Sequence, residues 1–221
     1  MLFSEALQIQ KGVTAVIGSG GKSTLLRVLA GELQSQGAVL LCTTTRMYPA
    51  ESVFTLYSPG EEDLRAALNA FGVVCAGALA EAGKLAAPEL PFEKLCELAD
   101  FVLVEADGSK RLPLKAHGPH EPVVPEEAGQ TICVVGLTGL GRPIREAAHR
   151  FTHYAELAET EEDTLVTPAL AAKVLRAENL ADRCFLNQAD DAAGQALGRE
   201  LQSALNMPAV VGSLWKGIVL C

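Results

Sequence analysis

A short glycine-rich run, set between an apolar segment and a helical segment, constrains this chain more than any other feature. The run consists of Gly18, Ser19, Gly20, Gly21, Lys22, Ser23 and Thr24. It follows the β-branched, apolar residues 13–17 and leads into the helical pattern of residues 25–30. A strand, a glycine turn and a helix N-terminus bind phosphate, because backbone N–H groups and the helix dipole both face the anion. We therefore expect a nucleotide's phosphates at residues 18–24, with Lys22 at the outer phosphates and the Ser23 hydroxyl on Mg²⁺.

The glycine spacing is shorter than in the common form of this motif. In G-x-x-x-x-G-K-[ST] the first glycine lies five residues before the second, whereas Val16 holds that place here. The match is to G-x-x-G-K-[ST], from Gly18 to Ser23, which resembles the loop of Mur-type ligases. The alternative is a strand-to-helix turn in which Gly-Gly-Lys-Ser occurs by chance. We disfavour it because a strand-like and a helical segment flank the loop.

Composition and charge narrow the class of protein. With 221 residues, 49% of them hydrophobic and 20% charged, we expect one soluble globular domain over residues 1–221, with two small domains as the alternative. The 27 acidic and 18 basic residues give a net charge of −9, which disfavours binding to nucleic acid or to an anionic membrane. The six cysteines form no C-x-x-C pair, so we expect buried thiols in a reducing compartment. Without a basic region followed by an apolar core at the start, the expected location is the cytoplasm.

Strand-like and helix-like segments alternate along the chain. Strands are expected at residues 13–17, 38–42, 73–76, 101–104, 131–135, 184–186, 209–211 and 217–220. Helices are expected at residues 22–36, 61–70, 91–98, 168–176 and 192–205. This order predicts an α/β fold with a doubly wound, mainly parallel sheet of the P-loop nucleoside triphosphate hydrolase type. Residues 108–129 are rich in Pro, Gly, His and Lys, and they are predicted to form a long irregular active-site loop.

Carboxylates follow the strand expected at residues 101–104. Glu105 and Asp107 lie two residues apart, so their side chains would share one face of an extended strand. An acid at a strand end beside a phosphate loop holds Mg²⁺ directly or through water, and we assign both as metal ligands and catalytic residues. The alternative is that they form only the solvated end of a strand.

The strand at residues 38–42 runs into Thr43, Thr44, Thr45 and Arg46, at the same expected edge of the sheet. One of these hydroxyls, for which we select Thr44, can bind Mg²⁺, and Arg46 can neutralise a phosphate as a catalytic residue. Threonines that only favour β-structure, beside an exposed arginine, are an equally good explanation.

The irregular loop and a later segment carry further basic side chains. Lys115 is interpreted as a mobile catalytic cation beside a polyphosphate. His117 and His120 lie in the same loop, and His149 and His153 are four apart on an expected helix. Neither pair has a third ligand, so we assign no metal to them.

Asn187, Gln188, Ala189 and Asp190 follow the strand at residues 184–186. They resemble the N-K-x-D element of guanine-nucleotide proteins, in which the aspartate accepts hydrogen bonds from the guanine edge. Gln188 stands where that element has lysine. An Asn turn followed by an Asp cap for the next helix explains the same residues, and both interpretations stay open.

Taken in order along nearly the whole chain, these segments resemble the YqeC family of selenium-dependent molybdenum hydroxylase accessory proteins. The resemblance rests on residues 18–24, 43–45, 104–109, 112–116, 136–141, 149–150 and 186–190. The run E-A-D-G-S leading into L-P-L-K-A is its most specific part, because generic phosphate-loop proteins lack it. The resemblance implies a nucleotide-dependent protein that helps to mature a molybdenum hydroxylase carrying a labile selenium.

Three functions are compatible with these features. The first is a Mg²⁺-dependent NTP hydrolase or metallochaperone-like switch, in which hydrolysis changes residues 108–129 and drives cofactor insertion or target release. The second is a ligase or kinase-type transferase, which the Mur-like spacing favours. The third is a binding module that senses a nucleotide without turnover. The expected ligands are ATP or GTP with Mg²⁺, the expected partner is a molybdenum hydroxylase or its cofactor-maturation proteins, and a homodimer is left open.

Overall fold

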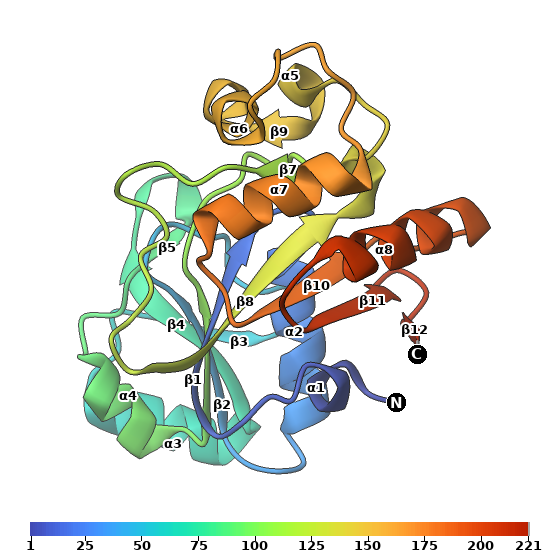
Figure 1. Ribbon diagram of the computed structural model, residues 1–221. Helices are drawn as coiled ribbons and strands as arrows, with labels where there is room; N and C mark the ends of the chain where they lie inside the picture. The colour runs from blue at the N-terminus through green and yellow to red at the C-terminus, as the bar shows by residue number, and fades with distance from the viewer. Residues whose placement is uncertain (221) are drawn as a thin grey trace. The chain divides into compact units, whose positions relative to one another are not determined.

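The computed structural model describes residues 1–220, which form two structural units (Figure 1). Unit 1 comprises Met1–Val16, Ser23–Gly108 and Val123–Thr131. Unit 2 comprises Ile17–Lys22, Ser109–Pro122 and the described part of Ile132–Cys221. The chain passes from one unit to the other within strands β1 (Gly12–Gly18) and β8 (Ala128–Gly136), so neither unit is one continuous stretch of sequence.

Unit 1 contains a parallel sheet of apolar strands. Its strand order is β1, β6, β2, β4 and β3, and every neighbouring pair is parallel. The strands after β1 are β2 (Val39–Thr43), β3 (Phe54–Tyr57), β4 (Val73–Leu79) and β6 (Phe101–Glu105), and the short β5 (Leu85–Ala86) pairs antiparallel with β4. Strands β2 and β6 are buried along their whole length, as parallel strands covered on both faces should be.

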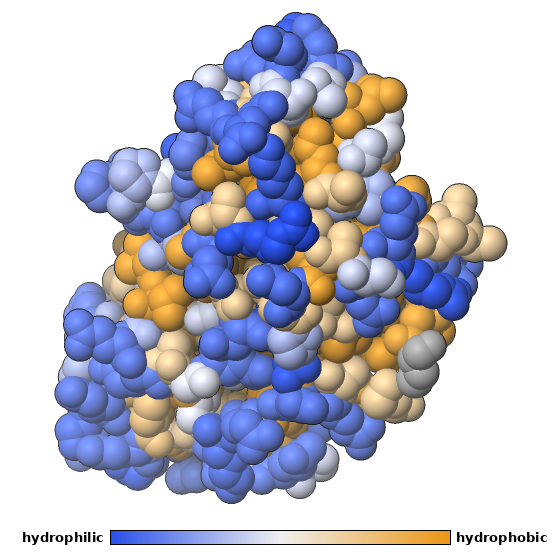
Figure 2. Space-filling model, in the orientation of Figure 1, coloured by the Kyte–Doolittle hydropathy of each residue, from blue (hydrophilic) through white to orange (hydrophobic). Residues whose placement is uncertain are grey.

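Helices cover both faces of this sheet. They are α1 (Phe3–Ala6), α2 (Lys22–Leu33), α3 (Glu61–Phe71) and α4 (Phe92–Leu98), with a 3₁₀ turn at Glu81–Gly83. Leu64 of α3 and Leu95 of α4 pack with Leu40 and Val102 in one buried cluster. Each fully buried side chain of this kind stabilises the fold by about 1.5–3 kcal/mol. Figure 1 shows α2 on the opposite side of the strands, and Figure 2 shows a mainly hydrophilic surface over α3 and α4.

Unit 2 contains a second set of mostly parallel strands. The C-terminal part of β8 is followed in the sheet by β10 (Arg183–Asn187), β11 (Ala209–Ser213) and β12 (Ile218–Leu220), of which only β12 runs antiparallel to its neighbour. Its helices are α5 (Ile144–Ala147), α6 (Phe151–Ala158), α7 (Pro168–Glu178) and α8 (Ala192–Ala204), with a 3₁₀ turn at Leu137–Gly139. A separate two-stranded sheet joins β7 (Leu114–Lys115) to β9 (Ala148–His149).

The α/β organisation expected from the sequence, with mostly parallel strands, is confirmed. Each expected strand overlaps a strand of the structure, and each expected helix overlaps a helix. The helix expected over residues 22–36 ends earlier, at Leu33, because the chain tightens there and Gln36 N donates to Leu33 O at 2.8 Å. The single-domain organisation over residues 1–221 stays a prediction.

Several short elements were not expected. Strand β3 lies at the edge of its sheet and has four residues. Four residues are too few to show the alternation of apolar and polar side chains that identifies a strand in a sequence. His149 lies in β9 and His153 in α6, so the expectation that the two share a helix is wrong. Arg150 separates the two elements in the left-handed conformation, at a φ of 59°. Among residues 1–220, no helix has both the length and the apolar character needed to cross a bilayer.

Candidate functional site

At two positions the loop after β1 lies too close to other backbone segments of unit 2 to carry a side chain. Gly18 and Gly20 have φ values of +88° and +90°, which side chains rarely adopt. A Cβ atom on Gly18 would lie 2.4 Å from Val134 O, and one on Gly20 would lie 2.5 Å from Gly136 Cα. Both glycines are therefore required by conformation and by space.

The loop lysine is buried in unit 2. Lys22 is 4% exposed, and its Nζ donates to Gly18 O at 2.8 Å, across the loop. A phosphate is a stronger acceptor for an ammonium group than a neutral carbonyl, because a charge-assisted hydrogen bond is about twice as strong. The loop thus holds the Lys22 ammonium group on the carbonyl of Gly18, and a bound phosphate would replace that carbonyl as the acceptor.

Side chains from distant parts of unit 2 hold the loop backbone. Asn187, at the end of β10, donates from Nδ2 to Gly20 O at 2.7 Å and accepts from Leu214 N at 3.1 Å. Ser19 donates from Oγ to Leu112 O, in the segment that precedes β7. The loop is therefore tied both to the irregular segment and to the connection after β11.

Asp190 accepts a hydrogen bond from Ser213 Oγ, at the end of β11. The N-cap of α8 is Asp191, whose side chain accepts from Gly194 N at 2.7 Å, so the alternative that Asp190 caps this helix is wrong. Gln188 has a φ of +72°, and its Oε1 accepts from Thr138 Oγ1 at 2.6 Å. Its side chain is therefore held by the 3₁₀ turn after β8.

In unit 1 the residue after the loop lysine meets the first of the predicted carboxylates. Ser23 Oγ donates to Glu105 Oε2 at 2.6 Å, and Glu105 is 7% exposed at the end of β6. Thr43, at the end of β2, donates from Oγ1 to Glu105 O at 2.7 Å. Strand β6 lies between β1 and β2, which is why a residue at its end reaches both neighbours.

Asp107 and Thr44 lie near the same strand ends of unit 1. Asp107 is fully buried two residues beyond Glu105, and Ala106 N, between them, donates to Val16 O at 3.0 Å. Thr44 donates from Oγ1 to Val123 O at 2.6 Å. Among the threonine hydroxyls, that of Thr43 therefore bonds the Glu105 backbone, and a metal-binding role for Thr44 stays a prediction.

Two other predicted residues of unit 1 lie at the surface. Arg46 pairs with Glu81 at 3.7 Å, and both side chains are well exposed. Arg46 therefore pairs with neither Glu105 nor Asp107, the two carboxylates predicted at the metal. Thr24, at the start of α2, is also exposed.

Lys115 is not a mobile cation. Its side chain is 0% exposed, and its Nζ lies 2.8 Å from Glu121 Oε2. Glu121 also pairs with Arg150 at 3.0 Å. Burial raises the pKa of Glu121, but the hydrogen bonds and charges of Lys115 and Arg150 outweigh it and hold that pKa below its usual range. A catalytic role for Lys115 stays a prediction.

Three histidines of unit 2, His117, His149 and His153, make protein contacts. His117 is 5% exposed and pairs with Glu178, with Nδ1 at 3.1 Å from Oε2. His153 pairs with Glu156 on the surface of α6 at 3.0 Å. Burial, together with the charges of Lys115 and Arg150, lowers the pKa of His149. Within residues 1–220, no three His, Cys, Asp or Glu side chains gather as metal ligands.

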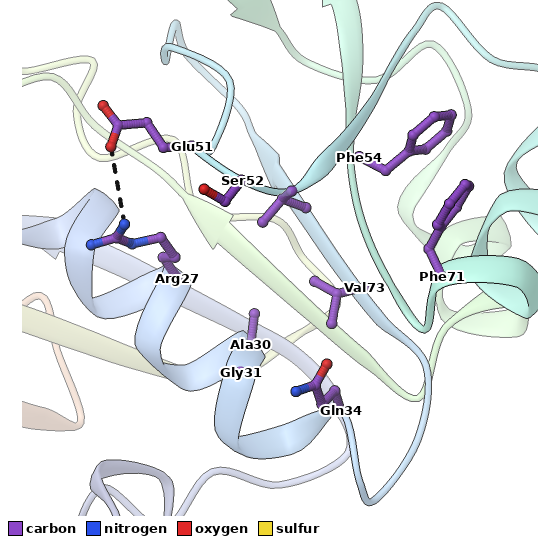
Figure 3. A pocket seen from close by; sticks show the side chains of 10 residues that line it. Arg27, Ala30, Gly31, Gln34, Glu51, Ser52, Phe54, Phe71 and Val73 are labelled. Atoms are coloured by element: carbon purple, nitrogen blue, oxygen red, sulfur yellow. Dashed lines mark ion pairs between the residues drawn. The ribbon is translucent and has the colours of Figure 1, made fainter.

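A cavity of about 330 Å³ in unit 1 lies between α2 and strands β3 and β4 (Figure 3). At its edge the rings of Phe54 and Phe71 stack at 4.2 Å, and Arg27 lies 4.0 Å from Glu51. None of the predicted site residues lines it. The lining residues are Arg27, Ala30, Gly31, Gln34, Glu51, Ser52, Val53, Phe54, Phe71 and Val73.

Three polar residues beside the predicted ones were not singled out from the sequence. Thr43 was not chosen among three adjacent threonines, because a run of hydroxyls does not say which one faces a neighbouring strand. Glu121 is one of several acids in an irregular segment. Ser213 ends β11, two residues beyond the strand expected at residues 209–211, and a polar residue just after that strand was the signal that could have identified it.

The fold and the loop define an α/β protein with a strand, a glycine-rich loop and a helix in the arrangement of P-loop proteins. The chain belongs to the YqeC family, whose model, described as YqeC protein, matches residues 14–152. It is similar to YqeC of Escherichia coli (strain K12), with 34% identity over 172 residues, which cover 73% of this chain and 67% of that protein.

Among solved structures the chain is similar to the signal recognition particle 54 kDa protein from Aeropyrum pernix K1, solved in complex with GDP. The alignment has 13% identity and a TM-score of 0.41, and it covers 93% of this chain and 42% of that one. The chain therefore spans less than half the length of that structure.

Proposed function

We propose that this protein binds a nucleoside triphosphate with Mg²⁺, and that residues 18–24 hold the phosphates. One observation carries the proposal: the Ser23 hydroxyl, next to the loop lysine, lies 2.6 Å from Glu105 Oε2. In the sequence these residues are far apart, and both were expected at Mg²⁺. Their contact brings together, within unit 1, a hydroxyl and a carboxylate that can both act at a cation.

The residues present fit the metal. Mg²⁺ prefers hard oxygen ligands and keeps several waters, so one hydroxyl, carboxylates and substrate phosphates suffice. Because Ser23 Oγ donates its proton to Glu105, its lone pairs are available to a cation. Ser23 would hold the metal, Glu105 would orient the hydroxyl, and buried Asp107 would add negative charge. When bound, Mg²⁺ would neutralise charge on the phosphates.

Calorimetry with ATP and GTP, each with Mg²⁺ and with EDTA, tests the proposal. We expect micromolar or tighter binding of at least one nucleotide, and weaker binding when the metal is removed. Phosphate release measured on the same samples separates a hydrolase from a sensor, and product analysis with added acid and amine separates a ligase. If neither nucleotide binds at millimolar concentration, the proposal is contradicted.

The accessory role in maturing a selenium-dependent molybdenum hydroxylase is a second part of the proposal. Its support is the resemblance of the sequence to a family to which that role is attributed. In a host lacking this protein we expect an inactive hydroxylase of normal abundance. The wild-type chain should restore its activity, and Lys22→Ala should not. A hydroxylase that is fully active without this protein would argue against the role and leave nucleotide binding untouched.

A further inference from the structure

The connection after β11 is anchored to the phosphate loop. Asn187 bonds Gly20 O through Nδ2 and Leu214 N through Oδ1, so one side chain holds both segments of unit 2. A Cβ atom placed on Gly21 would also lie 3.5 Å from Leu214 Cδ1. A ligand whose phosphates lie in the loop therefore has this connection as a close neighbour.

Ser213 gives Asp190 a defined orientation. Lys216 N donates to Ser213 Oγ at 3.0 Å, and that hydroxyl in turn donates to Asp190 Oδ1. An ionised carboxylate has about four acceptor sites and no donor, so this bond leaves most of its capacity unused. Asp190 is only half-buried and can present the rest to a ligand.

The acceptors of Asp190 match one purine better than the other. The Watson–Crick edge of guanine carries two adjacent N–H donors, at N1 and at the exocyclic amine, whereas adenine has an acceptor at N1. A carboxylate can accept from both guanine donors at once, and it would face the adenine N1 lone pair without a proton between them. Such a mismatch between polar groups gives strong discrimination.

An aromatic ring lies two residues beyond Ser213. Trp215 is 88% exposed, in the connection between β11 and β12, and it is the one tryptophan of the chain. Stacking of a base on an aromatic side chain contributes about 1–3 kcal/mol. Trp215 directly follows Leu214, whose N–H is bound by Asn187, so the exposed indole is available to stack on a base held near this connection.

We propose that the nucleotide is a guanine nucleotide, with Asp190 reading the base edge, Ser213 positioning that carboxylate, and Trp215 stacking on the base. This inference rests on the nucleotide binding proposed above.

The single tryptophan provides a direct test. Wild-type protein is titrated with GTP, ATP and inorganic tripolyphosphate while Trp215 fluorescence is recorded, and affinities are measured separately by calorimetry. We expect GTP to bind at least tenfold more tightly than ATP and to quench the fluorescence, and tripolyphosphate to bind without quenching. Binding of ATP as tightly as GTP overturns the inference but leaves the proposed function standing. Absence of all nucleotide binding overturns both.

Substitutions assign the roles. Asp190→Asn should lose GTP affinity and gain affinity for xanthosine triphosphate, because the amide donates to the extra carbonyl of that base. Ser213→Ala should lower the ratio of GTP to ATP affinity, and Ser213→Thr should restore it. Trp215→Ala should weaken GTP about 5- to 150-fold and leave tripolyphosphate unchanged. Asp163→Asn, which alters an exposed acid of unit 2, is the matched control. Unchanged base preference in Asp190→Asn overturns the assignment.

Discussion

Asn187 Nδ2 donates to Gly20 O at 2.7 Å, across 167 residues of sequence. Asn187 is 5% exposed and lies at the carboxyl end of β10. Gly20, whose carbonyl it binds, has a positive φ. The conformation of the phosphate loop therefore depends on a side chain from a late strand as well as on its own glycines.

Lys22→Ala should weaken triphosphate binding by about 2–4 kcal/mol, because it removes a charge-assisted contact in a buried position. Lys22 is the first residue of α2, outside the apolar core of either unit, so we expect the fold to persist. Calorimetry with GTP and ATP measures the loss, and the circular dichroism spectrum checks the fold. Lys173→Ala, which removes an exposed cation of α7, is the control. Equal affinity of Lys22→Ala and wild type would contradict the site.

Glu105→Gln and Asp107→Asn should weaken the Mg²⁺-dependent part of nucleotide binding more than the metal-free part. A neutral amide is a poorer ligand than a carboxylate for a hard cation. We expect the larger effect for Glu105→Gln, because Glu105 is the residue bonded to Ser23. Affinities with Mg²⁺ and with EDTA give the two parts, and Glu93→Gln on α4 is the control. An unchanged Mg²⁺ dependence in both variants would exclude this pair as the metal site.

Gly20→Ala and Gly31→Ala should change stability in opposite directions. A Cβ atom on Gly20 would meet the backbone of Gly136, at a φ that strains any side chain, and we expect a loss of about 2 kcal/mol or more. Gly31 is exposed in α2 with nothing within 4 Å of the added atom, so alanine there should stabilise the helix by up to about 1 kcal/mol. Urea unfolding of both variants measures this, and a stable Gly20→Ala protein would show that the loop is not confined.

Glu121→Gln should destabilise the fold most at neutral pH. Lys115 and Arg150 hold the pKa of Glu121 below its usual range against the effect of burial. Their stabilisation is fully present above the ordinary value of about 4.3, and it is lost as the pH falls through the lower folded pKa. We expect a loss of about 1–3 kcal/mol at pH 7, because the neutral amide no longer balances the charge of the buried Lys115 side chain.

The difference between Glu121→Gln and wild type should shrink at pH 3, which lies below the ordinary glutamate pKa of about 4.3, because the carboxyl of the unfolded wild-type chain takes up a proton there. Urea unfolding at both pH values measures it. Glu159→Gln, which removes an ion pair with Lys173 at the surface, should cost much less than Glu121→Gln at pH 7, because water screens exposed charges. An equal loss of stability for Glu121→Gln at both pH values would refute this account of the ion pair between Glu121 and Lys115.

Local chemistry made much of the fold predictable. The apolar runs became buried strands, and the glycine turn became a loop entering a helix, because strand and helix periodicity and positive φ angles depend on a few neighbouring residues. The position of Glu105 at the end of its strand, two residues before Asp107, was also predictable from the sequence. The short edge strand β3 was not, because its four residues carry little pattern of their own.

The sequence by itself determined the α/β order, the loop at residues 18–24 and the acids after β6. Only the tertiary structure decided the partners: Thr43 beside Glu105, Ser213 on Asp190, and Glu121 on a buried Lys115 that the sequence suggested was mobile. Secondary structure follows from near neighbours in the chain. Hydrogen bonds and burial depend on which distant segments the packed strands bring together, and a sequence read in short windows does not contain that information.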